Sequence, residues 1–187
     1  MALSRKKDIR IVKTYKQLYD AIKALLKRRS FNRITVSDLC EEAVLSRSAF
    51  YLHFKDKYAL LASCLADMAE RMDKDEIEKA MVFSIYNENL FIRNIIENAD
   101  NETLDIVYIF MRECLAKLLE ISKENRNDPN FLVFSHFIAG GAMQLTKWRP
   151  GQKPEQVSVT KPFFSEMLHN TLDWEKRRIT RRDKNGG

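Results

Sequence analysis

Glycine and proline are scarce in this chain, with five glycines and four prolines among 187 residues. Both residues interrupt helices, and chains rich in loops or strands use more of them. Hydrophobic residues still make up 45% of the chain and charged residues 31%, an ordinary composition for a folded domain with a core. The scarcity therefore favours an all-α fold.

Cysteine is also rare, and its pattern excludes two kinds of site. Cys40, Cys64 and Cys114 are odd in number and lie far apart in apolar stretches. This is typical of buried free thiols rather than of a disulfide framework or a zinc site. No uncharged run approaches the ~20 residues that cross a bilayer, and no apolar segment follows the charged first residues. We therefore expect a cytoplasmic protein with no metal, no cofactor and no membrane partner.

Motifs of common catalytic sites are missing as well. The chain has no His-Glu-x-x-His, no phosphate-cradling glycine loop and no Gly-x-Ser-x-Gly turn. Glu166 and His169 have the Glu-x-x-His spacing of di-iron bundles, but such a site needs a second copy and two more glutamates. We therefore expect no enzyme activity and no catalytic residue.

Charge is present but unevenly distributed. Residues 1–60 hold 14 Lys and Arg against 6 Asp and Glu, a net charge of +8, whereas residues 61–174 carry −6 and residues 175–187 carry +4. A basic head on an acidic body is expected when the head alone meets a polyanion. A solvated basic surface would give the same numbers, so charge alone leaves both interpretations open.

Helical spacing and capping residues organise the basic head. Apolar residues recur at steps of three and four over residues 8–29, which predicts a first helix. Thr35 and Asp38 form a capping box for a second helix, Ser46 caps a short third one, and Asp56 caps a long fourth one. Beyond it we predict helices over about 76–97, 103–124, 130–148 and 162–178. We expect about nine helices in the whole chain.

The second and third predicted helices, with the residues that follow them, contain the candidate binding residues. Two short helices that meet at Val44 can cross steeply, and a second helix with an arginine, small hydroxyls and a methyl on its outer side can enter a major groove. Side chains beyond it could then reach phosphates. Taken singly, each of these residues could also be an ordinary exposed helix residue. The candidate DNA-binding residues are Thr35, Ser46, Arg47, Ser48, Ala49, Tyr51, His53 and Lys57.

The end of this segment is similar to a known family motif. Residues 51–57 read Tyr-Leu-His-Phe-Lys-Asp-Lys, which resembles the Tyr-x-His-Phe-x-x-Lys string that closes the recognition helix of TetR-family transcriptional regulators. Residues 31–36 and Leu60-Leu61 also fit, so the resemblance covers about residues 10–65. It implies an N-terminal three-helix helix-turn-helix DNA-binding domain at 1–55 and a helical regulatory and dimerisation domain at 56–187.

The resemblance also implies roles for single residues. Thr35 would contact backbone phosphate, three residues of the third helix would face base edges, and three residues beyond them would bind phosphates. The base-facing residues would be Arg47, Ser48 and Ala49, and the phosphate-binding ones Tyr51, His53 and Lys57. The family usually has glycine or a similarly permissive residue where this chain has Val44, so the turn either avoids positive φ or is strained.

The body is expected to form a homodimer on a palindromic operator. By resemblance, the last two long helices, Phe131–Trp148 and Pro162–Arg178, would form a four-helix bundle with their copies, and Gly140-Gly141 would permit close approach. An ordinary intramolecular core is the alternative. The family implies a repressor released by a small-molecule ligand; the alternative is a DNA-bound adaptor or activator that recruits a protein partner without sensing a ligand.

A ligand pocket would be lined by helically spaced aromatic and sulfur side chains of the body, although such residues are also plain core residues. The candidates are Met68, Phe83, Tyr86, Phe91, Tyr108, Met111, Cys114, Phe134 and Phe137. Residues 137–141 and Lys147-Trp148 resemble regulators of dihydroxyacetone metabolism, from which Pro162 departs. At the other end of the chain, the basic residues 5–7 form either an arm that reaches DNA or a disordered tip.

Overall fold

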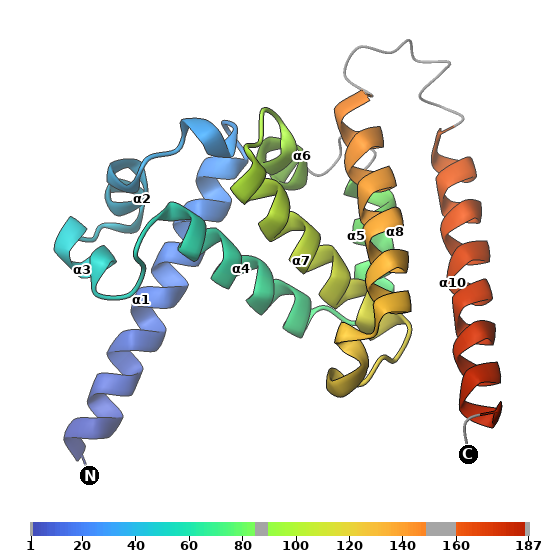
Figure 1. The fold of residues 1–187 in the computed structure, drawn as a ribbon. Coiled ribbons are helices and arrows are strands. Elements are labelled where there is room, and N and C mark those ends of the chain that lie inside the picture. The colour runs from blue at the N-terminus through green and yellow to red at the C-terminus, as the bar shows by residue number, and fades with distance from the viewer. Residues whose placement is uncertain (1, 85–89, 149–159, 186–187) are drawn as a thin grey trace. The chain divides into compact units, whose positions relative to one another are not determined.

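The computed structural model describes the backbone of residues 2–84, 90–148 and 160–185 (Figure 1), and within these ranges the chain forms helices and no strand. The all-α prediction is therefore confirmed. The described helices are α1 (Ala2–Leu26), η1 (Phe31–Arg33), α2 (Val36–Ala43), α3 (Arg47–Tyr51), α4 (Lys57–Arg71), α5 (Lys74–Ser84), α6 (Leu90–Ile96), α7 (Asn101–Leu118), η2 (Lys123–Asn127), α8 (Pro129–Trp148) and α10 (Thr160–Asn185).

The chain folds as two compact units, and both are built from two stretches of sequence. The first unit comprises Met1–Met68 and Leu90–Val107, and the second comprises Ala69–Asn89 and Tyr108–Gly187. The first unit is thus larger than the predicted head of residues 1–55. The reason is that most of α4 and all of α6 pack with the helix-turn-helix rather than with the body.

The core of the first unit is formed along one face of α1. Leu18, Ile22 and Leu26 are fully buried at steps of four, which places them on one side of the helix. Helices as short as α2 and α3 are not stable alone in water. They are held by burial of three apolar side chains in α2 and one in α3, at about 1.5–3 kcal/mol per large side chain that is fully buried. These side chains include Leu39 and Cys40 of α2 and Phe50 of α3.

Helix α6 joins the first unit through a buried polar contact. The Asn94 amide is 9% exposed and donates a 2.7 Å hydrogen bond from Nδ2 to the carbonyl of Leu26, the last residue of α1. This bond satisfies one of the carbonyls that a helix C-terminus leaves without a partner. A single helix over 76–97 was expected; the structure describes α5 as far as Ser84 and α6 from Leu90, and residues 85–89 lie outside the described residues.

The second unit contains α5, most of α7, η2, α8 and α10. Phe131, Ile138 and Phe164 are among its most buried side chains. Helix α10 begins at Thr160, so Pro162 lies in its first turn as expected, but it continues beyond the predicted end at residue 178. None of the described helices is long and apolar enough to span a membrane.

Candidate nucleic-acid interface

Helix α2 begins at the capping box that the sequence predicts. The Thr35 hydroxyl accepts from the Asp38 amide at 3.2 Å, and the Asp38 carboxylate accepts from the Thr35 amide at 2.7 Å. The Thr35 hydroxyl also donates to that carboxylate at 2.7 Å. These bonds, with Arg29 at 3.0 Å, lower the pKa of Asp38. The single proton of the Thr35 hydroxyl is thus engaged locally. Thr35 and Ser37 are both exposed in this turn.

The turn between α2 and α3 has a left-handed residue. Val44 has φ 54° and ψ 48°, so of the two alternatives left by the sequence the structure shows positive φ. Its side chain is 86% exposed, and no packing offsets the steric cost of about 1–2 kcal/mol that this conformation has for a residue with a Cβ. The turn is closed by the Leu45 amide, which donates to the Cys40 carbonyl at 2.9 Å.

Helix α3 is oriented by one buried aromatic side chain. Phe50 is fully buried and Phe54 is 5% exposed, while the Ser46 hydroxyl caps the helix by accepting from the Ala49 amide at 3.1 Å. The opposite side is open: Ser46, Arg47 and Ser48 are exposed and Ala49 is half-buried. The predicted base-facing residues therefore lie together at the N-terminal end of α3, a position that gives them access to a groove.

The residues that follow α3 differ in accessibility. Tyr51 is 50% exposed, so its hydroxyl is available to a phosphate. His53 is half-buried, and its ring contacts Tyr15 of α1 edge-on, with the ring centroids 5.5 Å apart. Tyr15 also packs against Phe54 at 5.0 Å. The end of α3 is thus fixed against α1 through two aromatic contacts.

Lys57 is not placed as predicted. Its ammonium group donates to three backbone carbonyls, those of Phe31 at 3.1 Å, Asn32 at 3.2 Å and Ile34 at 2.9 Å. An ammonium has three N–H donors, so none is left for a phosphate. The expected phosphate contact of Lys57 is therefore corrected to an internal contact that fixes η1 to the start of α4.

The surroundings of Lys57 support this internal role. Its Nζ lies 4.7 Å from the ring centroid of Phe31 and 5.4 Å from that of Tyr58, distances at which a cation is attracted to an aromatic face. Burial lowers the pKa of Lys57, although Asp100 opposes that change. Sequence reasoning missed this role because the three carbonyls lie more than twenty residues away along the chain.

Sequence reasoning also missed an exposed apolar residue at the interface. Leu52, directly after α3, is 81% exposed. It lies within the Tyr-x-His-Phe string at the position that the motif leaves unspecified, and an apolar residue there was a signal in the sequence. Leu52 and Val44 thus place two exposed apolar side chains on either side of α3 in the sequence. Such side chains can contact a thymine methyl group.

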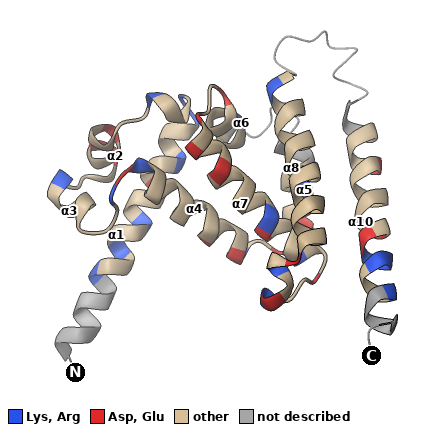
Figure 2. Cartoon of the chain, viewed as in Figure 1, with Lys and Arg blue, Asp and Glu red and all other residues tan. Residues whose placement is uncertain are grey.

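Charges of opposite sign are separated on the first unit. Lys and Arg occur on α1 and at the start of α3, whereas α2 carries Asp and Glu (Figure 2). Two acidic residues of α2 are paired with residues that follow α1, since Arg28 binds Glu42 at 2.6 Å and Arg29 binds Asp38. Arg47 at the start of α3 is exposed and is accessible to a polyanion.

The candidate ligand-pocket residues are divided between the two units. Met68 and Phe91 belong to the first unit, whereas Tyr108, Met111 and Cys114 belong to the second. Phe91, Met111, Cys114 and Phe134 are buried, but Phe137 is 71% exposed and is corrected to a surface residue of α8. Tyr86 lies outside the described residues, as does the side chain of Phe83.

Two hollows occur elsewhere in the described residues, and no candidate pocket residue lines either. One, of about 60 Å³, lies in the second unit, and its lining includes Phe131, Glu175 and Arg178. The other, of about 450 Å³, is an open surface depression at the paired charges of α1 and α2. Tyr108 instead forms a polar contact, in which its hydroxyl lies 2.7 Å from His136 Nδ1 and 3.1 Å from the Ser135 hydroxyl.

The Glu-x-x-His pair is not assembled into a metal site. His169 Nε2 contacts the Glu78 carboxylate, and its Nδ1 lies 2.6 Å from the Ser165 carbonyl oxygen. Among the described residues no three His, Cys, Asp or Glu side chains are grouped as metal ligands. All three cysteines are free and buried, as predicted.

Residues 18–64 match the family model of "Bacterial regulatory proteins, tetR family". The N-terminal helix-turn-helix is a TetR-family domain. A HTH-type transcriptional regulator of Bacillus subtilis (strain 168), the uncharacterised YxbF, is 36% identical over 58 residues, which are 31% of this chain and 15% of the relative. The TetR-family repressor AlkX from Dietzia sp. strain DQ12-45-1b, implicated in biodegradation of n-alkanes, is similar over 84% of this chain and 96% of its own, with 14% identity and a TM-score of 0.46.

Proposed function

We propose that this chain is a cytoplasmic, sequence-specific DNA-binding repressor that acts as a homodimer on a palindromic operator. The observation that carries the proposal is the open outer side of α3, where Ser46, Arg47 and Ser48 are exposed on a helix oriented by the buried Phe50. The family that the domain matches is one of regulatory proteins rather than of enzymes.

Each exposed side chain has a proposed role in this interface. Arg47 donates two parallel hydrogen bonds to a guanine, which is worth roughly 1–3 kcal/mol of discrimination. Ser48 and Ala49 face neighbouring base edges, and Tyr51 contacts a flanking phosphate. At the start of α2, free backbone amides and the Ser37 hydroxyl serve the phosphate contact that the sequence assigned to Thr35.

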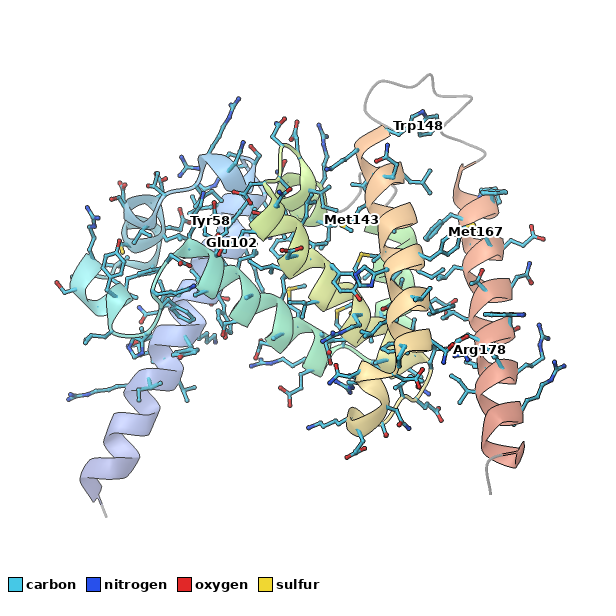
Figure 3. All side chains as sticks on the ribbon, in the orientation of Figure 1. Tyr58, Glu102, Met143, Trp148, Met167 and Arg178 are labelled. Atoms are coloured by element: carbon cyan, nitrogen blue, oxygen red, sulfur yellow. The ribbon has the colours of Figure 1, made fainter. Side chains whose placement is uncertain are left out.

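An apolar stripe on the second unit supports the homodimer. Val133 and Phe137 are each 71% exposed on α8, one helical turn apart, and Trp148 at the end of the same helix is 40% exposed (Figure 3). Gly140 and Gly141 lie between them, and a Cβ built on either has no atom within 4 Å. On α10, Phe163 and Trp174 are also exposed. Exposed apolar residues in such a row are typical of a protein interface.

Release of the repressor by a small molecule is the mode that the family implies. The cavity of about 60 Å³ in the second unit is smaller than the roughly 300–1,000 Å³ of ligand sites. The second candidate function is a DNA-bound adaptor, and the exposed apolar stripe of α8 supports it because such a row can recruit a protein partner. Sedimentation distinguishes the two: a stripe that is covered in a stable homodimer is not available to an adaptor's partner.

Selection of bound sites from a random duplex pool at physiological salt tests the proposal. We expect enrichment of a palindrome whose half-sites are centred about 10 base pairs apart, or a multiple of that, because a dimer presents two reading helices one DNA turn apart. The Arg47→Ala variant should enrich a degenerate half-site. A pool that shows no enrichment would overturn the proposed function.

A further inference from the structure

The described side chains of α1 that precede Leu18 are not buried. Arg10 and Lys13 are exposed, and Val12 is 68% exposed. Leu18 is the first described side chain of the helix to be buried. Figure 1 shows the N-terminal half of α1 (dark blue) continuing beyond the rest of the first unit. The exposed side chains of residues 10–13 are therefore accessible to a partner.

The charge of this segment indicates the kind of partner. Residues 2–13 contain five basic residues and one acidic residue, Asp8, a net charge of +4. Arg10, Lys13 and Gln17 follow one another at steps of three and four, so they share one face of the helix. Two cations one turn apart on an exposed helix face are complementary to the phosphates of a nucleic-acid backbone. The acidic residue that shares this face, Asp20, lies about two turns beyond Lys13.

Contacts on both sides of α1 place this segment beside the reading helix. Gln17 donates from Nε2 to the carbonyl of Ala43, at 3.5 Å, immediately before the Val44 turn that leads into α3. On another face of α1, Tyr15 contacts His53 just after the end of α3. Lys13 and Arg10 lie one and two turns before Gln17. These basic side chains therefore lie on the part of α1 that extends from the unit next to α3.

We propose that Arg10 and Lys13 of α1, which we call the arm, are a second DNA contact of this chain. The arm binds phosphates next to the half-site that α3 reads and reads no sequence itself, because lysine and arginine contacts to phosphate position a protein without discriminating between bases. This inference rests on the proposed function, and it extends the contact beyond the base pairs that α3 covers.

The test compares full-length wild type with the variant Arg10→Gln/Lys13→Gln. Glutamine has a helix propensity near that of lysine and arginine, and both side chains are exposed, so the fold should be kept. The readout is the slope of log affinity against log salt, on a duplex that carries the selected site with long flanks and on a random duplex. A matched control, Lys79→Gln/Lys123→Gln, removes two exposed charges from the second unit.

The variant removes two phosphate contacts from each bound subunit, and about 0.9 counterions are released per phosphate contact. The slope of log affinity against log salt should therefore be smaller by about two per bound subunit, on both duplexes. Affinity at low salt should fall by about tenfold, with an unchanged ratio of selected to random duplex. On a duplex trimmed to the edges of the site, wild type and the variant should bind equally. The control should keep the wild-type slope.

Three outcomes would overturn the arm. The first is that the variant keeps the wild-type slope on the long duplex, and the second is that it loses no more slope than the control variant does. The third is a change in the ratio of its affinities for the selected and the random duplex, which would mean that the arm reads bases. If wild type itself prefers no duplex, the proposed function fails along with the arm. Because wild type is measured in every series, that failure is distinguishable from failure of the arm alone.

Discussion

The hydroxyl of Tyr58 donates a 2.6 Å hydrogen bond to the carboxylate of Asp100 and so ties the start of α4 to the turn before α7. Figure 3 shows Tyr58 near the start of α7, where Glu102 lies. Asp100 also caps α7 by accepting from the Thr103 amide at 2.8 Å. The contact reaches the interface through Tyr58, because its ring packs against Phe31, 5.5 Å away, beside the Lys57 ammonium.

The Tyr58–Asp100 bond predicts a pH-dependent contribution to stability. Bonding to Tyr58, and then to Thr103, lowers the pKa of Asp100 from its ordinary 3.8 to about 2. A carboxyl group whose pKa is depressed on folding stabilises the fold above its unfolded-state pKa and loses that contribution as pH falls through its folded-state pKa. Because Asp100 is exposed, we expect Tyr58→Phe to cost about 1 kcal/mol at neutral pH after allowance for solvent screening.

Denaturant unfolding of both proteins between pH 7 and pH 2 checks this prediction. The difference between wild type and Tyr58→Phe should be constant above about pH 4 and should shrink between pH 4 and pH 2. A difference that stays the same down to pH 2 would show that the lost stability comes from packing of the tyrosine and not from its bond to the carboxylate.

The left-handed Val44 predicts a stabilising substitution at the interface. Val44→Gly should raise the free energy of unfolding by about 1 kcal/mol, because glycine adopts positive φ without steric cost and the exposed valine side chain packs against nothing that would be lost. Thermal and denaturant unfolding measure the change. Val44→Ala is the matched control, since it shortens the side chain but keeps a Cβ at positive φ, and an equal gain in both variants would argue against backbone strain.

The three bonds of Lys57 predict a loss of stability rather than of a phosphate contact. Lys57→Met should lower the free energy of unfolding by about 1–3 kcal/mol, as expected when bonded carbonyls lose a charged donor. Any loss of DNA affinity should follow the loss of folded protein, and the salt dependence of binding should keep its wild-type slope. If Lys57 bound a phosphate, the slope would fall by about one.

The variant Lys57→Arg separates the two roles in a second way. Arginine keeps the charge, so a phosphate contact would survive, but its planar fork does not match three converging carbonyls. We expect Lys57→Arg to be destabilised in urea. Wild-type stability in this variant would contradict the internal role.

The glycine pair of α8 predicts a test of the homodimer. In the isolated subunit Gly140→Ala/Gly141→Ala should be tolerated, since each new Cβ meets open space and alanine is the better helix former by up to about 1 kcal/mol per site. If a second copy approaches closely at these glycines, the added methyl groups should weaken the dimer. Sedimentation at micromolar concentration should show more monomer than for wild type.

The dimer test also needs a control variant that loses an exposed apolar side chain outside the stripe. Phe137→Ser removes an apolar side chain of the stripe, whereas Ile109→Ser removes one that is 49% exposed on α7. The stripe variant should dissociate and the α7 variant should not. A wild-type chain that sediments as a monomer would exclude the homodimer and favour the adaptor.

Local signals in the sequence predicted where helices α2, α3 and α4 begin. The capping box of Thr35 and Asp38 and the caps at Ser46 and Asp56 are all present, because a cap depends on residues only two or three apart. Burial of Phe50 could also be predicted, since it follows from helical spacing. The caps and the buried Phe50 together indicate which side of α3 is exposed, and this inference needs no knowledge of contacts between distant segments.

Contacts between distant segments could not be predicted in the same way. Nothing near Lys57 in the sequence indicates that the carbonyls of residues 31–34 will surround it, and nothing near Asn94 indicates a bond to Leu26. The candidate pocket residues were inferred from a signal with a similar limit. Helically spaced aromatic residues mark a face of a helix, but what that face meets is decided by tertiary packing, and Phe137 faces outward.

Fluorescence anisotropy titrations with the selected duplex and a scrambled duplex, at about 0.15 M salt, test the central claim that the outer side of α3 reads base pairs. We predict that wild type binds the selected duplex at least about a thousandfold more tightly than the scrambled one. Arg47→Lys, which keeps the charge but not the bidentate fork, should lose about 1–3 kcal/mol on the selected duplex alone. Equal affinity of wild type for both duplexes would contradict the account.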